Sequence, residues 1–201
     1  MIAIIDYDAG NIKSVEKAFE FLGIETVTTR DPDVILNADK VVLPGVGAFG
    51  DAMAKLTEYG LVDVIHEVVE KKTPLLGICL GLQLLFDESE ESKGVAGLGI
   101  LKGRVLRFAE DTEYKIPQIG WNSIEISPES KLFAGIDNQS YVYFVHSYYL
   151  RAEDESVVAA TCDYANHFHA AVEKDNVYAC QFHPEKSSDT GLKILENFAN
   201  L

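Results

Sequence analysis

The chain has 201 residues, of which 47% are hydrophobic and 24% are charged, a composition typical of globular proteins. Its 17 basic and 32 acidic residues give a formal net charge of −15, which makes nucleic acids and anionic membrane surfaces poor partners. This length fits one domain, and no linker or shift in composition divides the sequence, so we expect a single domain over residues 1–201.

The cysteines and the N-terminus indicate a reducing compartment. Cys79, Cys162 and Cys180 are too few and too widely spaced for a disulfide framework. The first residues have no basic segment ahead of an apolar run, so we expect no signal peptide. The longest apolar runs are far shorter than the roughly 20 residues that span a bilayer. We therefore expect a soluble, cytoplasmic protein.

Strands and helices alternate in the first half of the chain. Short apolar runs predict buried strands, and apolar residues three and four positions apart predict amphipathic helices. The expected strands are 2–5, 24–28, 40–43 and 74–78, and the expected helices are 11–21, 48–59, 61–71 and one from residue 80 into the acidic stretch 87–91. This alternation is typical of a parallel sheet covered by helices on both faces.

The second half is mostly strand-like and closes with a helix. The expected strands are 105–108, 123–126, 141–149, 157–162, 170–174 and 177–182, and the expected helix is 189–199. We therefore predict an α/β fold with a mostly parallel central sheet flanked by helices, and with additional antiparallel strands in the C-terminal half.

The segment Gly77-Ile78-Cys79-Leu80-Gly81 lies where a strand is expected to end and a helix to begin. In G-x-S-x-G hydrolases the nucleophile occupies such a turn, and glycines allow close backbone packing there. Unpaired N–H groups at a helix start stabilise a thiolate over a thiol. Cys79 is therefore the candidate nucleophile, and the Leu80 N–H is placed to donate to an oxyanion. A buried structural cysteine is the alternative that this motif leaves open.

A thiol nucleophile needs a base, and the base needs a group that orients it. His183 directly follows the strand expected over 177–182, and Pro184 ends that strand. Glu185 lies two residues further on, close enough to accept a hydrogen bond from the far ring nitrogen. We therefore expect His183 to be the base and Glu185 its orienting acid.

Other histidines are weaker candidates for the base. His167 and His169 lie near an expected turn, so we expect them to face solvent. His146 lies on an expected strand and is the one that could line a site.

A zinc site formed by Cys162, Cys180 and His183 is disfavoured. Cys180 and His183 have a ligand-like spacing, but strand alternation does not bring such a set together and no second ligand pair completes it. We expect no metal and no cofactor.

The stretch from Gly45 to Gly50 matches the G-x-G-x-x-G pattern of dinucleotide-binding sites. That pattern requires an acidic residue about 20 positions later, at the end of the next strand. The matching position here lies inside an expected helix, which disfavours a nucleotide site. The exposed N–H groups of this loop can instead hold an oxyanion or a carboxylate.

Three motifs together resemble the triad class of glutamine amidotransferases, and the resemblance runs nearly end to end. They are Pro44-Gly45-Val46-Gly47, Gly77-Ile78-Cys79-Leu80-Gly81-Leu82-Gln83 and Gln181-Phe182-His183-Pro184-Glu185-Lys186-Ser187. Further motifs are similar to the members that supply ammonia to a cyclase in histidine biosynthesis: Tyr7-Asp8-Ala9-Gly10-Asn11, Ile119-Gly120-Trp121-Asn122 and Phe144-Val145-His146-Ser147-Tyr148. The resemblance implies the flavodoxin-like fold of this class.

The resemblance also implies roles for particular residues. Cys79 would form a glutamyl thioester with glutamine, His183 would transfer the proton and then activate water, and Glu185 would orient His183. The oxyanion hole would use the N–H groups of Leu80 and of the Val46-Gly47 segment. The residues expected to contact glutamine are Gly47, Gln83, Glu91, His146, Ser147 and Tyr148.

The implied partner is a (β/α)8 cyclase that forms a heterodimer with this chain and receives ammonia through a shielded path. Asn11, Trp121 and Lys186 fall where the family meets this partner. Two alternatives stay open: a glutaminase of another pathway, such as pyridoxal phosphate or nucleotide synthesis, and a cysteine peptidase or γ-glutamyl hydrolase on the same scaffold. A third, a catalytically silent regulatory subunit, is disfavoured because all three triad residue types are present.

Overall fold

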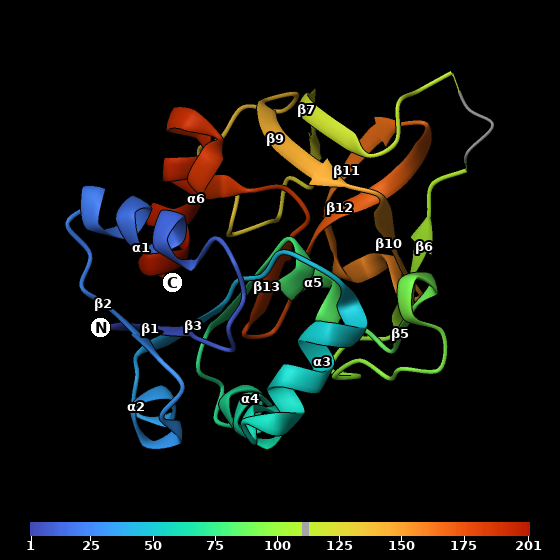
Figure 1. Ribbon diagram of the computed structural model, residues 1–201. Coiled ribbons are helices and arrows are strands. Elements are labelled where there is room, and N and C mark those ends of the chain that lie inside the picture. The colour runs from blue at the N-terminus through green and yellow to red at the C-terminus, as the bar shows by residue number, and fades with distance from the viewer. Residues whose placement is uncertain (110–112) are drawn as a thin grey trace.

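The computed structural model describes residues 1–109 and 113–201, and a long mixed sheet forms its centre (Figure 1). The helices are α1 (Ile12–Phe21), α2 (Pro32–Leu36), α3 (Phe49–Glu58), α4 (Leu61–Glu70), α5 (Leu80–Leu84) and α6 (Ser188–Ala199). The strands are β1 (Ile2–Ile5), β2 (Thr26–Thr29), β3 (Lys40–Leu43), β4 (Leu75–Ile78), β5 (Glu88–Ser89), β6 (Gly103–Arg107), β7 (Gln118–Ser123), β8 (Glu125–Ile126), β9 (Tyr141–His146), β10 (Tyr148–Ala152), β11 (Val158–Tyr164), β12 (Asn166–Lys174) and β13 (Val177–Cys180).

The sheet order is β2-β1-β3-β4-β13-β12-β10-β6-β5, with β11 paired to β12 and β8 to β11. Strands β2, β1, β3, β4 and β13 run parallel to one another. The pairs from β13 through β12 and β10 to β6 are antiparallel, and a separate antiparallel pair joins β7 to β9. The predicted fold class, a mostly parallel sheet with antiparallel strands added in the C-terminal half, is confirmed.

Helices cover both faces of the parallel strands because these strands are apolar on both sides. In β1, Ala3 and Ile5 pack into one core with α2, α3 and α4, whereas Ile2 and Ile4 pack into another with α1 and α6. Figure 1 shows α1 and α6 on one side of the sheet and α2 to α4 on the other.

Three predicted elements differ from the structure. The strand expected over 123–126 is instead the last residue of β7 and the short strand β8, and β7 itself was not predicted. The helix expected to run from residue 80 to the acidic stretch ends at Leu84. The Asp87 N–H donates to the Gly103 carbonyl and the Asp87 carboxylate accepts the Gly103 N–H, which draws the chain into β5 beside β6. The single strand expected over 141–149 is two strands that separate at Ser147, since β9 pairs with β7 while β10 pairs with β6 and β12.

One helix was missed although its start carries a signal. The Asp31 carboxylate accepts the N–H of Asp33 at 3.0 Å, and Pro32 occupies the first helical position of α2. An acidic N-cap followed by proline is a recognised helix start.

Candidate active site

The carboxyl ends of β1, β3, β4 and β13 lie side by side at one edge of the sheet. Each strand leads into a segment singled out from the sequence: 7–11 after β1, 44–47 after β3, Cys79 after β4, and 181–185 after β13. In open parallel sheets, ligands bind at this edge. The strand order therefore gathers motifs that are far apart in the chain.

Cys79 lies on a strained turn between β4 and α5. Its backbone has φ 55° and ψ −106°, and its N–H donates to the Cys180 carbonyl at 2.8 Å. Non-glycine residues hold such a conformation only where the surrounding structure enforces it. The turn is also closely packed: a Cβ on Gly81 would lie 1.8 Å from the Leu43 carbonyl oxygen, so no larger residue fits there.

His183 and Glu185 form a buried pair. Nδ1 of His183 donates to Oε1 of Glu185 at 2.7 Å, and both side chains are fully buried. The Asn11 amide also donates to Glu185 Oε1, at 2.6 Å. Nε2 of His183 is buried and makes no hydrogen bond within the described residues. Burial alone would lower the pKa of His183, but interactions with Cys79 and Glu185 outweigh it and raise the pKa to about 10.

The raised pKa favours the protonated imidazolium form of His183. Among the described residues, Nε2 of His183 has no hydrogen-bond partner, which leaves this nitrogen available to exchange a proton.

Replacing Glu185 by glutamine should lower kcat for glutamine hydrolysis, with a loss about 100-fold smaller than that caused by removing the nucleophile. The amide retains an oxygen for His183 and Asn11, but it removes a charge that raises the His183 pKa. In the reaction expected from the sequence, a protonated His183 releases ammonia, so the alkaline limb of the kcat/KM profile should move to lower pH. Steady-state ammonia release between pH 6 and 10 measures both effects, and an unchanged profile would contradict the assigned role.

The Leu80 N–H, a predicted oxyanion donor, is occupied. It donates to the Gly45 carbonyl at 3.2 Å. The buried Tyr7 hydroxyl holds the preceding peptide by donating to the Pro44 carbonyl at 2.8 Å, and a Cβ on Gly45 would lie 2.2 Å from that hydroxyl. The Gly45 peptide must therefore rotate before Leu80 can donate to an oxyanion. A glycine is needed at position 45 because the Tyr7 hydroxyl leaves no room for a side chain, so this part of the G-x-G-x-x-G pattern is explained without a nucleotide.

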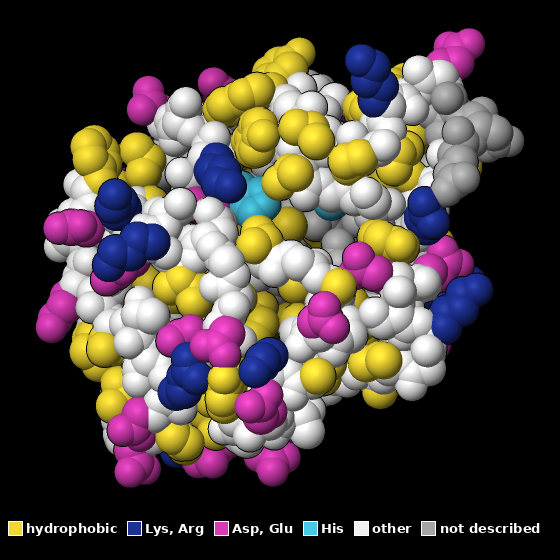
Figure 2. All heavy atoms as spheres, viewed as in Figure 1, with side chains coloured by type: hydrophobic (Ala, Val, Ile, Leu, Met, Phe, Trp, Pro, Cys, Tyr) yellow, Lys and Arg dark blue, Asp and Glu magenta, His cyan; other side chains and the backbone are white. Residues whose placement is uncertain are grey.

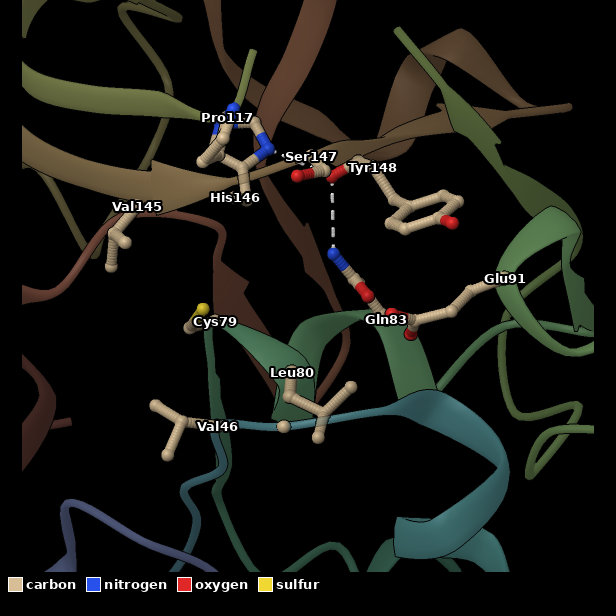
Figure 3. Close-up of a pocket in the computed structure, with 11 residues that line it drawn as sticks. Val46, Cys79, Leu80, Gln83, Glu91, Pro117, Val145, His146, Ser147 and Tyr148 are labelled. Carbon is tan, nitrogen blue, oxygen red and sulfur yellow. Dashed lines mark hydrogen bonds between the residues drawn. The ribbon is translucent and has the colours of Figure 1, made fainter.

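A cavity of about 310 Å³ opens beside the sulfur of Cys79 (Figure 3). Its lining includes all the residues predicted to contact glutamine or to form the oxyanion hole, and in addition Pro117 and Val145. In Figure 3, β9 and β10 form one wall with residues 145–148, while Cys79, Leu80 and Gln83 form the opposite wall. A volume of this size suits a small metabolite.

His146 lines the cavity but is not available as a base. Its Nδ1 lies 2.7 Å from the Tyr148 carbonyl and its Nε2 lies 2.8 Å from Gln118 Oε1. Burial lowers its pKa to about 4, so the ring is neutral at physiological pH. The expectation that His169 faces solvent is wrong: it is 5% exposed on β12, and its Nδ1 accepts the N–H of Ala152.

The three residues expected at a partner surface differ in their surroundings. Trp121 is 47% exposed on β7 and packs edge-on against Tyr143, and Lys186 is exposed beside the His183–Glu185 pair. Asn11 touches the Glu185 carboxylate directly, which links the surface to the buried pair.

Three residues at this edge were missed from the sequence: Tyr7, Gln118 and Gln181. All three are buried. The Tyr7 hydroxyl bonds to the Pro44 carbonyl, the Gln118 side chain to His146, and the Gln181 side chain to Gln83. Gln181 stands two positions before His183 in a recognised motif, which was a usable signal. Within residues 1–109 and 113–201, no group of three or more His, Cys, Asp or Glu side chains could hold a metal ion, and no helix there is long and apolar enough to cross a membrane.

A strained cysteine turn, a buried histidine–carboxylate pair and an adjacent cavity on a flavodoxin-like sheet are the features that a cysteine hydrolase requires. The family model "Glutamine amidotransferase class-I" matches residues 3–201. The chain therefore belongs to the class-I glutamine amidotransferase family, as its motifs predicted.

Relatives over the full length are more specific. The chain is 54% identical over 206 residues to "Imidazole glycerol phosphate synthase subunit HisH" of Syntrophotalea carbinolica, with complete coverage of both chains. It is 49% identical over 201 residues to the protein of the same name from Methanocaldococcus jannaschii, again with complete coverage of both.

Solved structures agree on the fold. A glutamine amidotransferase structure has a TM-score of 0.77 at 23% identity and covers 99% of this chain and 100% of its own. The structure of PurLQS from Thermotoga maritima has a TM-score of 0.76 at 19% identity and covers 99% of this chain and 97% of its own.

Proposed function

We propose that this chain is the glutaminase subunit of imidazole glycerol phosphate synthase and works as a single domain in the cytoplasm. It hydrolyses glutamine to glutamate and ammonia, and a (β/α)8 cyclase partner uses the ammonia to make imidazole glycerol phosphate and aminoimidazole carboxamide ribonucleotide. The observation that carries this proposal is the Cys79 turn beside the His183–Glu185 pair on a cavity of small-metabolite size.

The proposed reaction begins with a Cys79 thiolate and a protonated His183. The Cys79 thiolate attacks the carboxamide carbon of glutamine, and the resulting tetrahedral intermediate carries the negative charge on oxygen. His183 gives its proton to the nitrogen as the C–N bond breaks, which releases ammonia and leaves a glutamyl thioester. Neutral His183 then takes a proton from water, whose oxygen attacks the thioester, and the C–S bond breaks to release glutamate and to restore the Cys79 thiolate beside protonated His183.

Polar groups around the cavity fit the α-amino and α-carboxyl groups of glutamine. Glu91 places a carboxylate at the far end of the cavity, where it also accepts the Phe49 N–H at 2.8 Å, and it is suited to an ammonium group. Gln83 and the 146–148 segment line the same space and offer amide and main-chain partners.

The state of the oxyanion hole controls the activity in the proposed mechanism. The Gly45 carbonyl occupies the Leu80 N–H, so the tetrahedral intermediate lacks a donor until the Gly45–Val46 peptide turns over. Such a rotation frees the Leu80 N–H and brings the Val46 N–H toward the same oxyanion. Loss of one oxyanion donor typically costs about 100- to 1,000-fold in kcat, so this single rotation is a sufficient switch.

An exposed apolar patch on β7 and β9 suits the partner. Ile119, Trp121 and Tyr141 are 62%, 47% and 60% exposed. Figure 2 shows hydrophobic side chains gathered over these strands, close to a hollow where histidine is visible. Exposed aromatic and aliphatic side chains grouped on one surface are typical of protein interfaces.

The isolated chain should hydrolyse glutamine slowly, and the cyclase partner with its nucleotide substrate should raise kcat by about 100-fold or more. Ammonia release by the chain alone, with the partner, and with partner plus nucleotide measures this. Trp121→Ala should weaken partner binding, whereas Phe21→Ala, an exposed aromatic on α1, is the matched control. Equal kcat in all three conditions would reject coupling and favour a free-standing hydrolase.

A further inference from the structure

Gln181 is a buried polar residue at the catalytic edge that the mechanism above leaves without a role. It follows β13 directly, is fully buried, and its N–H donates to the Ala170 carbonyl at 2.8 Å. Its backbone is therefore held by β12, and a buried side-chain amide is retained only where it has partners.

The side chain of Gln181 connects the nucleophile to the cavity wall. Its Nε2 donates to Cys79 Sγ at 3.7 Å, and its Oε1 accepts Gln83 Nε2 at 3.0 Å. Gln83 Nε2 also donates to the Tyr148 carbonyl at 3.2 Å, the bond drawn in Figure 3.

The Tyr148 carbonyl determines which group donates in each of the three linked hydrogen bonds, from Tyr148 through Gln83 and Gln181 to Cys79. A carbonyl only accepts, so Gln83 must turn its NH₂ group toward Tyr148 and Gln181. Gln181 must then meet Gln83 with its oxygen and Cys79 with its NH₂ group. This order directs an N–H at the sulfur and leaves the Gln83 oxygen as the group offered to a ligand in the cavity.

We propose that Gln181 is a further residue of the catalytic site: it donates to the Cys79 thiolate and fixes the side-chain amide of Gln83 toward the substrate. The inference rests on the proposed glutaminase reaction. A donor to the charged form favours that form, so Gln181 adds to the stabilisation of the thiolate provided by His183.

The test is the pH dependence of Cys79 alkylation by iodoacetamide, followed by mass spectrometry of the Cys79 peptide in Gln181→Met and Gln181→Glu. Titratable groups that face the sulfur are His183, Tyr7 and Cys180, and burial raises the pKa of the latter two. All three stay in place in the variants, so any shift reports on Gln181. The midpoint should rise by about one pH unit in Gln181→Met, which slows alkylation about 10-fold below the midpoint, and by more in Gln181→Glu.

Asn176→Asp is the matched control. Asn176 stands at the opposite end of β13, is 7% exposed, and donates to the Val69 and Thr73 carbonyls far from the sulfur. This variant loses a buried amide without moving the midpoint. In the wild type, the side-chain NMR signal of Gln181 should shift when Cys79 is alkylated while that of Asn176 stays, a measurement that does not depend on the variants folding.

Unchanged midpoints in the folded Gln181 variants, or an unresponsive Gln181 signal in the wild type, would overturn the inference. Alkylation needs neither glutamine nor a partner, so this result is independent of whether the proposed function holds. With the partner present, Gln181→Met should also raise KM for glutamine, because Gln83 loses its fixed orientation.

Discussion

Cys79→Ala should reduce glutamine hydrolysis by at least about 10⁴-fold while the protein stays folded. The reaction requires a nucleophile, and Cys79, on the turn between β4 and α5, is the one cysteine among the described residues that lines the cavity. Alanine is smaller and fits the same backbone, so the fold should be little affected. Ammonia release with the partner present measures the loss, and circular dichroism and thermal unfolding check the fold.

Cys162→Ala and Cys180→Ala are the controls. Burial raises the pKa of Cys162 to about 12 and that of Cys180 well above the ordinary range, so both are neutral thiols at physiological pH. Both variants should keep most of the activity. Loss of turnover in either of them, together with an active Cys79→Ala enzyme, would refute the assignment of the nucleophile.

His183→Ala should cost nearly as much as loss of the nucleophile, because members of a triad act as a unit. The variant removes the group that pairs with the thiolate and also the proton donor for ammonia. It leaves the Glu185 carboxylate buried, with Asn11 as its one side-chain partner among residues 1–109 and 113–201. Measurement of kcat alongside Cys79→Ala, with the alkylation rate of Cys79 as a second readout, separates loss of the thiolate from loss of proton transfer.

His146 is the residue to examine if the His183 variant retains activity. Its two ring nitrogens already face Tyr148 and Gln118, and its pKa of about 4 makes it a weak base, so we expect no substitution for His183. Activity in His183→Ala that disappears in the His146→Asn double variant would show that His146 had taken over as the base.

Strong local patterns predicted most of the parallel half of the fold. Runs such as Ile2–Ile5 and Lys40–Leu43 are apolar on both faces and became the central strands at those positions. Elements whose limits depend on partners were predicted less well. The end of α5 is set by the pairing of Asp87 with Gly103. The division between β9 and β10 at Ser147 arises because the two strands pair in different sheets. Neither long-range pairing leaves a periodic pattern in the sequence.

The amino-acid sequence by itself determined the family, the fold class and the candidate chemistry, since a cysteine between glycines and a histidine followed two residues later by a carboxylate are local motifs. Only the tertiary structure decided how these groups act on one another. Long-range contacts place Tyr7 under the Gly45 peptide, Asn11 on Glu185 and Gln181 on the Cys79 sulfur. They also direct the Leu80 N–H to the Gly45 carbonyl. Each of these bonds joins segments that meet only because neighbouring parallel strands end at the same edge of the sheet.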